Sequence, residues 1–425
     1  MEKILFEISK NNMGEKRRII SILNRRTIGA ILFYIGITLE LLFVLYDKSA
    51  LHSLNTGLLF RVTFLLFAVK VLMTQYTFKE WCWMIGLGIV GYISYKCSGR
   101  NDMLRLVVMC AAFKEVDYKK VKRYTFYVML SGCLLIFGMA ILGIFGEMSM
   151  TAVFRMGQVA TRYTFGFGHP NQMHCMFWIV STLGVYCFWE KVNWIILSGL
   201  MVANVVIFLF TDSRGGLIGI TCTVFVSLLL KYAKGVRGKK WPYVLVSVCL
   251  VLVGIFSVFI AYFGLIYHTD YPAIWYNQWF AKFYLLDDKF LSGRLWSCYG
   301  LLTTDMRNFG LFSNPANQEF MDMGFYKLFY WYGYIPAILY LVAHILLLRY
   351  ADKNKDSALL MMVASFSAYT FLEAHLISPY LGRNYLLFVM GGLWSEILLA
   401  QDGTPLGWWN IPGVLMKKSK NGSEK

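Results

Sequence analysis

The sequence predicts an all-α, polytopic membrane protein with about twelve transmembrane helices. Hydrophobic residues make up 58% of the 425 residues and charged residues only 15%, a composition too apolar for a soluble domain of this length. The apolar residues form long runs, several of which reach the roughly 20 residues that a helix needs to cross a bilayer core. Strongly basic loops alternate with nearly uncharged ones, and the positive-inside rule converts this alternation into an orientation.

The apolar runs define the expected spans in chain order. They lie at about 28–46, 57–73, 81–96, 102–113, 125–146, 170–189, 193–210, 214–231, 242–267, 323–348, 358–378 and 384–400. The fourth run is short, and removing it would move every later loop to the opposite side. With it, the basic loops at 114–123, 231–240 and 349–355 fall in the cytoplasm together with both chain termini. The loop charges therefore support keeping the fourth span.

We expect one membrane domain with short cytoplasmic ends. A basic N-terminal segment (1–27) precedes a single transmembrane domain (28–400), and a cytoplasmic tail (401–425) follows it. Two outer loops are longer than turns: 147–169, and the long extracytoplasmic loop 268–322 between spans nine and ten. The second is rich in Trp, Tyr and Phe, which suits either an interfacial amphipathic helix or a sugar-binding surface.

Charge and cysteine patterns argue against several protein classes. The net charge is +17, but the Lys and Arg clusters lie in short loops between apolar runs, which suits an anionic membrane leaflet better than nucleic acid. The nine cysteines form no CxxC pair and show no zinc-like spacing with histidine. We therefore expect no metal, no cofactor and no nucleic-acid partner.

Five arginines do not fit the positive-inside pattern, because all of them fall at the predicted outer face: Arg155, Arg162, Arg214, Arg294 and Arg383. Cations retained on that side need an anionic partner. Arginine suits a diphosphate better than lysine does, because its planar fork matches two phosphate oxygens and stays charged. The sequence thus predicts an anion site at the outer surface.

The outer loop before the sixth span holds the densest group of polar residues. If the residues before position 166 are helical, Arg155 and Arg162 lie two turns apart on one helix face. Pro170 suits the first turn of the following span. The N-terminus of that span, with His169 and Asn171, would then offer free N–H groups and a positive dipole end to an anion.

A second candidate segment is the tight turn before the eighth span. Asp212 or Ser213 is expected to cap that span, and Arg214 stands in its first turn. A cation near the positive end of a helix dipole is unfavourable unless an anion is shared. The alternative for Arg214 is a side chain that reaches along the membrane interface.

Acidic residues and a further histidine complete the predicted outer site. Asp322 precedes the tenth span, and Glu373 and His375 lie at the outer end of the eleventh. Carboxylates at membrane depth are usually paired or functional, whereas His375 also suits a satisfied interior histidine. Glu40 and Arg61 lie at similar depth in spans one and two, and we expect them to form a structural ion pair.

Several of these segments resemble the motifs of one family, in the same order along the chain. They are Gly166-Phe-Gly-His-Pro-Asn171, Ser213-Arg-Gly-Gly216, Ser292-Gly-Arg294, Asn308-Phe-Gly310, and Asp322 followed by Tyr326 and Gly333; Arg155 precedes Gly166 as in an Arg-x10-Gly pattern of polymerases. The chain thereby resembles the O-antigen polymerase and ligase superfamily of bacterial membrane glycosyltransferases. Its 166–171 segment is similar to the capsular polysaccharide polymerase branch.

The resemblance implies a metal-independent glycosyltransferase in the bacterial cytoplasmic membrane. Its substrates would be undecaprenyl-diphosphate-linked oligosaccharides, joined at the outer face into capsular polysaccharide or exopolysaccharide. A flippase and a chain-length regulator are the expected protein partners, and the lipid bilayer is the third. Arg214 and Arg294 would form the diphosphate-binding pair, and further substrate contacts would come from Arg155, Arg162, Asn171, His375 and Arg383.

The general base is left open by the sequence. The ligase branch of the family carries a histidine before the span that follows the large loop, and residues 314–322 contain none. His169 is the first choice because its usual pKa suits proton transfer, and Asp322 and Glu373 are the competitors. The missing histidine favours a polymerase over a ligase. A glycolipid transporter or flippase is the third alternative, which would show repeats and broken helices.

Overall fold

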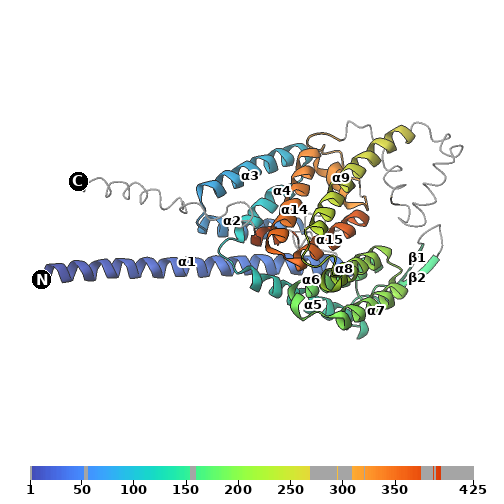
Figure 1. Cartoon of the computed structure of the whole chain (residues 1–425), viewed down its shortest axis with the longest axis horizontal. Coiled ribbons are helices and arrows are strands. Elements are labelled where there is room, and N and C mark those ends of the chain that lie inside the picture. The colour runs from blue at the N-terminus through green and yellow to red at the C-terminus, as the bar shows by residue number, and fades with distance from the viewer. Residues whose placement is uncertain are drawn as a thin grey trace.

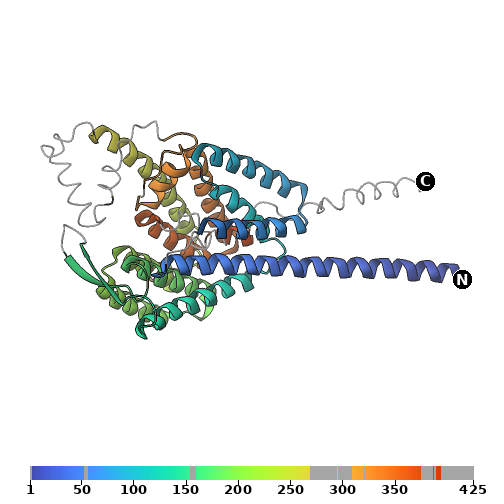
Figure 2. The same cartoon turned by 180° about the vertical axis from the view of Figure 1, so that it is seen from behind.

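The computed structural model describes residues 2–51, 56–153, 159–268, 294, 309–319, 321–374, 386 and 389–393. Within these ranges the protein is mostly helical, with one two-stranded antiparallel sheet. Helix α15 (Ser357–Leu372) lies in the interior of the helix bundle, and α1 (Glu2–Lys48) extends well beyond the bundle, as the two opposite views in Figure 1 and Figure 2 show.

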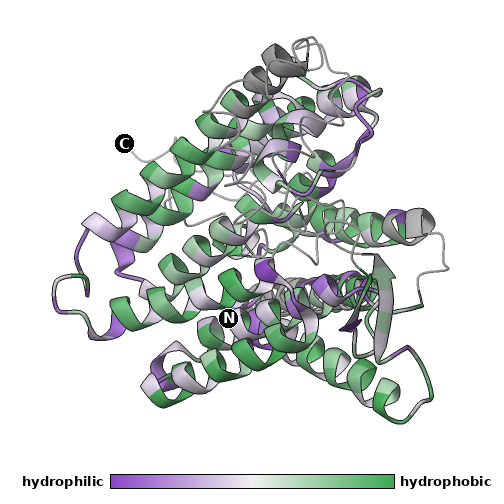
Figure 3. Ribbon diagram, turned by 90° about the vertical axis from the view of Figure 1, so that its right-hand side faces the viewer, coloured by the Kyte–Doolittle hydropathy of each residue, from purple (hydrophilic) through white to green (hydrophobic). Residues whose placement is uncertain are grey.

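Six helices in the described ranges are long and apolar enough to cross a membrane, judged by length and composition. They are Arg25–Lys48 of α1, α5 (Tyr118–Ile141), α7 (Trp194–Thr211), α8 (Arg214–Tyr232), Trp241–Phe259 of α9 (Trp241–His268) and α14 (Tyr334–Asn354). Hydrophobic residues run along most of the helices in Figure 3, and outward-facing ones such as Leu209 are up to 75% exposed. A helix suits this setting because lipid cannot satisfy backbone polar groups.

The predicted helical fold is therefore confirmed, and helices able to cross a membrane are present. The number of twelve spans and their orientation stay predictions. The basic N-terminal segment and the first predicted span form one continuous helix, α1. The predicted sixth span corresponds to α6 (Pro170–Cys187), and the short 3-10 turn η2 (Trp189–Lys191) follows it.

The helix at the predicted fourth span is shorter than the thickness of a bilayer core. It corresponds to α4 (Asp102–Ala112), which follows α2 (Thr56–Met73) and α3 (Phe78–Ser98). Eleven helical residues rise about 16 Å, roughly half of a bilayer core. The helix is nevertheless anchored deep in the protein, because the Tyr332 hydroxyl donates to the Asp102 carboxylate at 2.8 Å.

The outer loop before α6 is a β-hairpin, so the prediction of a helix carrying two arginines was wrong. Strands β1 (Ser149–Val153) and β2 (Val159–Tyr163) pair antiparallel, with Met150 opposite Arg162. Thr151 and Thr161 share a cross-strand hydrogen bond of 2.7 Å. Alternating threonines and valines favour extended backbone, which outweighs the i, i+7 arginine spacing.

The predicted tenth span is broken near its start. Helix α13 (Gly324–Tyr332) ends at Gly333, whose φ of 90° lies in the left-handed region, and α14 begins directly after it. A Cβ on Gly333 would lie 2.5 Å from the Phe312 Cα, so only glycine fits. The backbone N–H of Tyr334 donates to the Gly310 carbonyl at 3.0 Å, and that of Ser313 to the Tyr332 carbonyl at 3.2 Å. The preceding loop thus satisfies the backbone groups that the break exposes.

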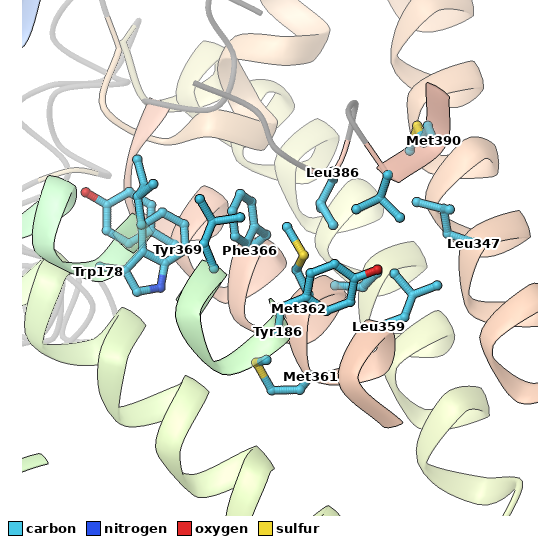
Figure 4. Packing of buried hydrophobic residues seen from close by; sticks show 14 of the residues in the cluster. Trp178, Tyr186, Leu347, Leu359, Met361, Met362, Phe366, Tyr369, Leu386 and Met390 are labelled. Carbon is cyan, nitrogen blue, oxygen red and sulfur yellow. The ribbon is translucent and has the colours of Figure 1, made fainter. Parts of the chain in front are cut away.

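Helix α15 is buried on nearly every side and forms the centre of the hydrophobic core. The Trp178 ring of α6 stacks on Tyr369 of α15 with centroids 4.0 Å apart (Figure 4). The Trp178 indole N–H donates to the Ser365 hydroxyl at 3.0 Å. Gly219 lets α8 approach, because a Cβ there would lie 2.9 Å from the same indole. This packing fixes the end of α15, which carries one of the predicted site residues.

The buried carboxylate of Glu40 pairs with a different arginine from the one predicted. Arg105 of α4 donates to Glu40 Oε1 at 3.2 Å, and the Thr63 hydroxyl donates to the same oxygen at 2.5 Å. Arg61 is exposed. The predicted Glu40–Arg61 ion pair was therefore wrong, because α4 inserts beside α1 and supplies the buried cation.

The loops expected in the cytoplasm gather at one end of the bundle. Asp356, between α14 and α15, is electrostatically coupled to Tyr118 at the start of α5, Tyr186 near the end of α6 and Tyr243 at the start of α9. The side of the membrane that this end faces stays a prediction. The candidate site lies at the other end of the bundle, where the end of α1, the starts of α6 and α8 and the end of α15 lie.

Candidate functional site

The end of α1 is joined to the turn before α6 by backbone hydrogen bonds. Gly168 N–H donates to the Lys48 carbonyl at 3.0 Å, and Ala50 N–H donates to the Gly166 carbonyl at 3.2 Å. Ser49 and Phe167 form an isolated β-bridge between the same segments. These contacts hold the last residue of α1 beside the first turn of α6.

His169 is the N-cap of α6, and Pro170 occupies the first helical position, as predicted. The imidazole Nδ1 accepts a hydrogen bond from the Asn171 backbone N–H at 3.1 Å. A neutral imidazole in this arrangement carries its proton on Nε2. Burial lowers the pKa of His169, as does the nearby Arg162, while Asp322 opposes the shift. His169 is therefore neutral at neutral pH and presents Nε2–H as a donor.

Arg162 reaches from β2 to the end of α7. Its guanidinium donates to the Asp212 carboxylate at 2.6 Å, and the arginine is 8% exposed. Asp212 ends α7 in a left-handed conformation with φ of 45°. Ser213 is the N-cap residue of α8 but its side chain makes no capping bond. The expectation that Asp212 or Ser213 caps α8 through its side chain was wrong, since Asp212 is used by Arg162.

Two glycines bring the N-terminus of α8 close to the ends of its neighbours. Arg214 opens the helix and is half-buried. A Cβ on Gly215 would lie 2.6 Å from Glu373 Oε1, and a Cβ on Gly216 would lie 2.3 Å from the His174 ring. The Ser-Arg-Gly-Gly turn therefore places the backbone of the first turn of α8 against the Glu373 carboxylate.

Glu373 follows the last residue of α15 and pairs with Arg294 of the long outer segment. The two side chains are only 14% and 10% exposed. The pair therefore keeps a cation and a carboxylate together in a poorly hydrated place.

Asp322 lies beside this pair, at the start of α13. A Cβ on Gly324 would lie 2.6 Å from the Thr370 carbonyl, so glycine allows the two elements to touch. Asp322 is half-buried and electrostatically coupled to both His169 and Glu373. Among the described residues, no ion pair or hydrogen bond restrains its carboxylate.

The structure thus brings together most of the predicted site residues that it describes. They are Arg162, His169, Asn171, Arg294, Asp322 and Glu373. Arg214 opens α8, one position before the Gly215 that packs against Glu373. The remaining three, Arg155, His375 and Arg383, lie outside the described residues.

Lys48 is a residue of this site that sequence reasoning missed. It is 8% exposed and electrostatically coupled to His169 and Glu373. The signal was present, because Lys48 ends the first span at the predicted outer face, where the positive-inside rule gives no reason for a cation.

The assembled groups are suited to holding an anion and moving a proton. The N-termini of α6 and α8 meet there, and both offer N–H groups and positive dipole ends. Arg162 and Arg294 keep their charges in a partly buried place, where electrostatic attraction is stronger than in water. Among the described residues, no cluster of His, Cys, Asp or Glu has the arrangement of a metal site.

Fold and site together define a mostly helical protein with membrane-length helices and a cation-rich site at one end of its bundle. Comparison of the chain with protein-family models, curated proteins and solved structures finds no match.

Proposed function

We propose that the chain is a polymerase that joins undecaprenyl-diphosphate-linked oligosaccharides into capsular polysaccharide or exopolysaccharide. The observation that carries the proposal is the convergence of Arg162, His169, Arg294, Asp322 and Glu373 beside the first turn of α8, which begins at Arg214. These residues come from five separate parts of the chain. An anion site built in this way, beside proton-accepting carboxylates, suits transfer of a glycan from a lipid diphosphate.

Arg214 and Arg294 hold the donor diphosphate in this mechanism. As the bond between the sugar C1 and the diphosphate oxygen breaks, negative charge grows on the leaving undecaprenyl diphosphate, and the two guanidinium groups stabilise it. Glu373 orients Arg294 through their ion pair. The site thereby stabilises the leaving group without a metal ion.

Asp322 accepts the proton of the acceptor hydroxyl that attacks C1. We prefer Asp322 to His169 because the Asn171 N–H occupies the His169 Nδ1, which leaves the imidazole as a donor through Nε2–H. Glu373 is already engaged by Arg294. A carboxylate that no described hydrogen bond restrains is better placed to act as general base.

The proposal places the protein in the cytoplasmic membrane of a bacterium, with the site facing outward. A flippase would deliver the lipid-linked repeats, and a chain-length regulator would act with the polymerase. The outward position of the site agrees with the few basic residues expected in the neighbouring loops.

A deletion strain tests the proposal. Its surface glycan is run on a gel after complementation with wild-type protein, Arg214→Ala, Arg294→Ala or the control Arg237→Ala, which alters an exposed arginine between α8 and α9. We expect long polymer from wild type and the control, and single lipid-linked repeats from the two site variants. Long polymer from Arg214→Ala at normal protein level would refute the diphosphate role. Long chains left on the carrier lipid in the deletion strain would instead indicate a ligase.

A glycolipid transporter is the second candidate, and the break at Gly333 favours it. Discontinuous helices are common at the binding sites of transporters. In that case the deletion strain would keep its lipid-linked repeats on the cytoplasmic side, where a membrane-impermeant glycosidase does not reach them. A polymerase deletion would leave the repeats accessible from outside.

A further inference from the structure

An open groove runs along α1 on the outside of the bundle. It has a volume of about 510 Å³ and extends from Thr27 to Leu39, with Tyr124 of α5 on its other wall. Both helices are long and apolar enough to cross a membrane. Ile31 and Ile35, which line the groove, are 53% and 46% exposed. The groove is therefore an apolar surface that faces the hydrocarbon of a bilayer.

The groove is closed at one end by contacts between α1 and α5. A Cβ on Gly132 of α5 would lie 2.2 Å from a side chain of α1, so the two helices touch beyond the groove. Nearer the start of α5, the hydroxyls of Thr38 and Tyr124 share a hydrogen bond of 2.6 Å. The Tyr124 ring also packs edge-on against Tyr34, with centroids 5.3 Å apart. The groove therefore opens toward Thr27, at the end of the bundle that the loop charges predict to be cytoplasmic.

The length of the groove matches one leaflet of a membrane. Between Thr27 and Leu39 the helix rises about 18 Å. Half of a bilayer core is about 15 Å thick. A single acyl chain can therefore lie along the groove from the membrane surface to the closed end.

Each wall of the groove continues into a basic residue at the open end. Arg26 lies one turn before Ala30 on α1, and Lys120 lies one turn before Tyr124 on α5. Side chains in a helix lean toward its N-terminus, which directs both cations toward the membrane surface. Their side chains are 58% and 78% exposed. The apolar groove thus has a cationic mouth.

The mouth remains positive when its carboxylates are counted. Arg26 Nε lies 3.8 Å from Glu115 Oε2, and Lys120 Nζ lies 3.9 Å from Asp117 Oδ2. Arg25 shares the Glu115 carboxylate at 3.8 Å, and two of its guanidinium nitrogens make no hydrogen bond in the described part of the chain. Exposed ion pairs at such distances are weak. Three cations therefore face two carboxylates, which favours an additional anion.

We propose that the groove binds a phospholipid with a negatively charged head group. The head group lies between Arg26 and Lys120, and one acyl chain follows the groove past Ile31 and Ile35. Basic pockets between membrane helices on the cytoplasmic side are typical sites for such head groups. The lipid bridges α1 and α5 below the contact of Thr38 with Tyr124. This site lies at the opposite end of the bundle from the candidate anion site, so the inference does not depend on the proposed function.

Native mass spectrometry of the full-length protein in detergent tests the proposal. The probes are dioleoyl phosphatidylglycerol and dioleoyl phosphatidylcholine, which have the same acyl chains and differ in head-group charge. We expect wild-type protein to bind phosphatidylglycerol about tenfold more tightly, because two basic residues attract its head group. Equal binding of the two lipids would overturn the proposal. Displacement of phosphatidylglycerol by an equal concentration of inorganic phosphate would also overturn it, since the ligand would then be free phosphate.

Charge variants assign the preference to the mouth of the groove. The double variant Arg26→Gln/Lys120→Gln is expected to bind the two lipids equally. Its control, Lys234→Gln/Arg237→Gln, removes the same charge from two exposed residues between α8 and α9 and is expected to keep the preference. Loss of the preference in the control as well would show that it reflects net charge alone, and would refute the assignment to Arg26 and Lys120.

Photocrosslinking locates the acyl chain. A phosphatidylglycerol with a diazirine midway along one chain is incorporated into nanodiscs with the protein, and the labelled peptides are identified. We expect label within residues 30–39 or at Tyr124, and its loss in Ala30→Trp and Ile31→Trp, which fill the groove without changing its charge. Label that persists at these positions in both folded variants would contradict the site. A wild-type dimer that Ala30→Trp converts to a monomer would show that the groove receives a second copy of the chain instead of a lipid.

Discussion

Arg294 donates a hydrogen bond to Glu373 across 79 positions of the sequence, and this ion pair joins the long outer segment to the end of α15. Both side chains are largely buried. The charge of each is therefore compensated mainly by the other, which links the stability of the fold to the integrity of the site.

The first prediction concerns this pair. Removing one partner of a buried ion pair costs about 3–5 kcal/mol, because the other charge remains without compensation. We expect Glu373→Ala to lower the free energy of unfolding by about 3 kcal/mol, and the double variant Glu373→Ala/Arg294→Met to lose less than the sum of the single changes. Denaturant unfolding in one detergent measures the free energy of unfolding of Glu373→Ala, Arg294→Met and the double variant. Additive losses would show that the two side chains do not interact.

The second prediction concerns the glycines at the start of α8. Gly215→Ala would push a methyl group against Glu373, and Gly216→Ala would push one against His174. We expect each to lower stability by about 1–3 kcal/mol and to reduce polymer length. Gly199→Ala in α7 is the control, because a Cβ there meets nothing within 4 Å. That change should be neutral or stabilising, since alanine favours helix. Equal thermal shifts in the three variants would contradict the close packing.

The third prediction separates the two candidate partners of Glu40. Arg105→Met removes the cation that pairs with Glu40, and we expect a loss of about 3 kcal/mol in the free energy of unfolding. Arg61→Met should change stability by less than about 0.5 kcal/mol, because Arg61 is exposed. Thermal unfolding of the purified variants shows which of the two arginines stabilises Glu40. A larger loss from Arg61→Met would restore the pairing expected from the sequence.

The fourth prediction is a pH dependence that originates at His169. The pKa of His169 is lower in the folded protein than its usual value, so the unfolded chain binds a proton first as the pH falls. The stability that His169 contributes is therefore complete above pH of about 6.5 and decreases below it. His169→Asn keeps a capping side chain that does not titrate. The difference in melting temperature between wild type and this variant should change between pH 7 and pH 5, and a constant difference would exclude the effect.

The fifth prediction assigns the general base. Loss of a positioned base slows turnover by roughly 10²–10⁴-fold, so Asp322→Asn should nearly abolish polymerisation while pyrophosphate binding is kept. His169→Asn should retain most of the activity, because asparagine still caps α6. Turnover of lipid-linked repeats in nanodiscs measures both. If His169→Asn lost its turnover and Asp322→Asn kept it, His169 would be the general base instead.

Periodicity and composition predicted the helical elements well. The runs at 57–73, 81–96, 193–210, 214–231 and 242–267 became helices with ends within three residues of expectation, and Pro170 and His169 begin α6 as expected. The first run instead became part of a helix that starts at Glu2, and the tenth was divided at Gly333. The hairpin of β1 and β2 was missed because its arginine spacing is compatible with a helix, whereas threonine pairing across strands decides the local structure. The break at Gly333 was missed because its cause is the loop around Phe312, which is remote in sequence.

Site residues were predictable in type but not in pairing. The positive-inside rule identified Arg162, Arg214 and Arg294 as out of place. The structure brings Arg162 and Arg294 into one region, and the first turn of α8, which Arg214 opens, packs against it. The rule could not identify Asp212 and Glu373 as the ion-pair partners of Arg162 and Arg294, because those contacts depend on how distant helices pack. The same rule also identifies Lys48, which ends the first predicted span at that face, but its burial arises only in the assembled bundle.

The position of Glu373 near the end of the described chain has a consequence for biosynthesis. Arg162, Arg214 and Arg294 all leave the ribosome before it, and Asp212, the partner of Arg162, is also made earlier. The carboxylate that pairs with Arg294 arrives only once α15 has been made. A nascent chain that stops before the end of α15 therefore lacks the contact that ties the long outer segment to the bundle.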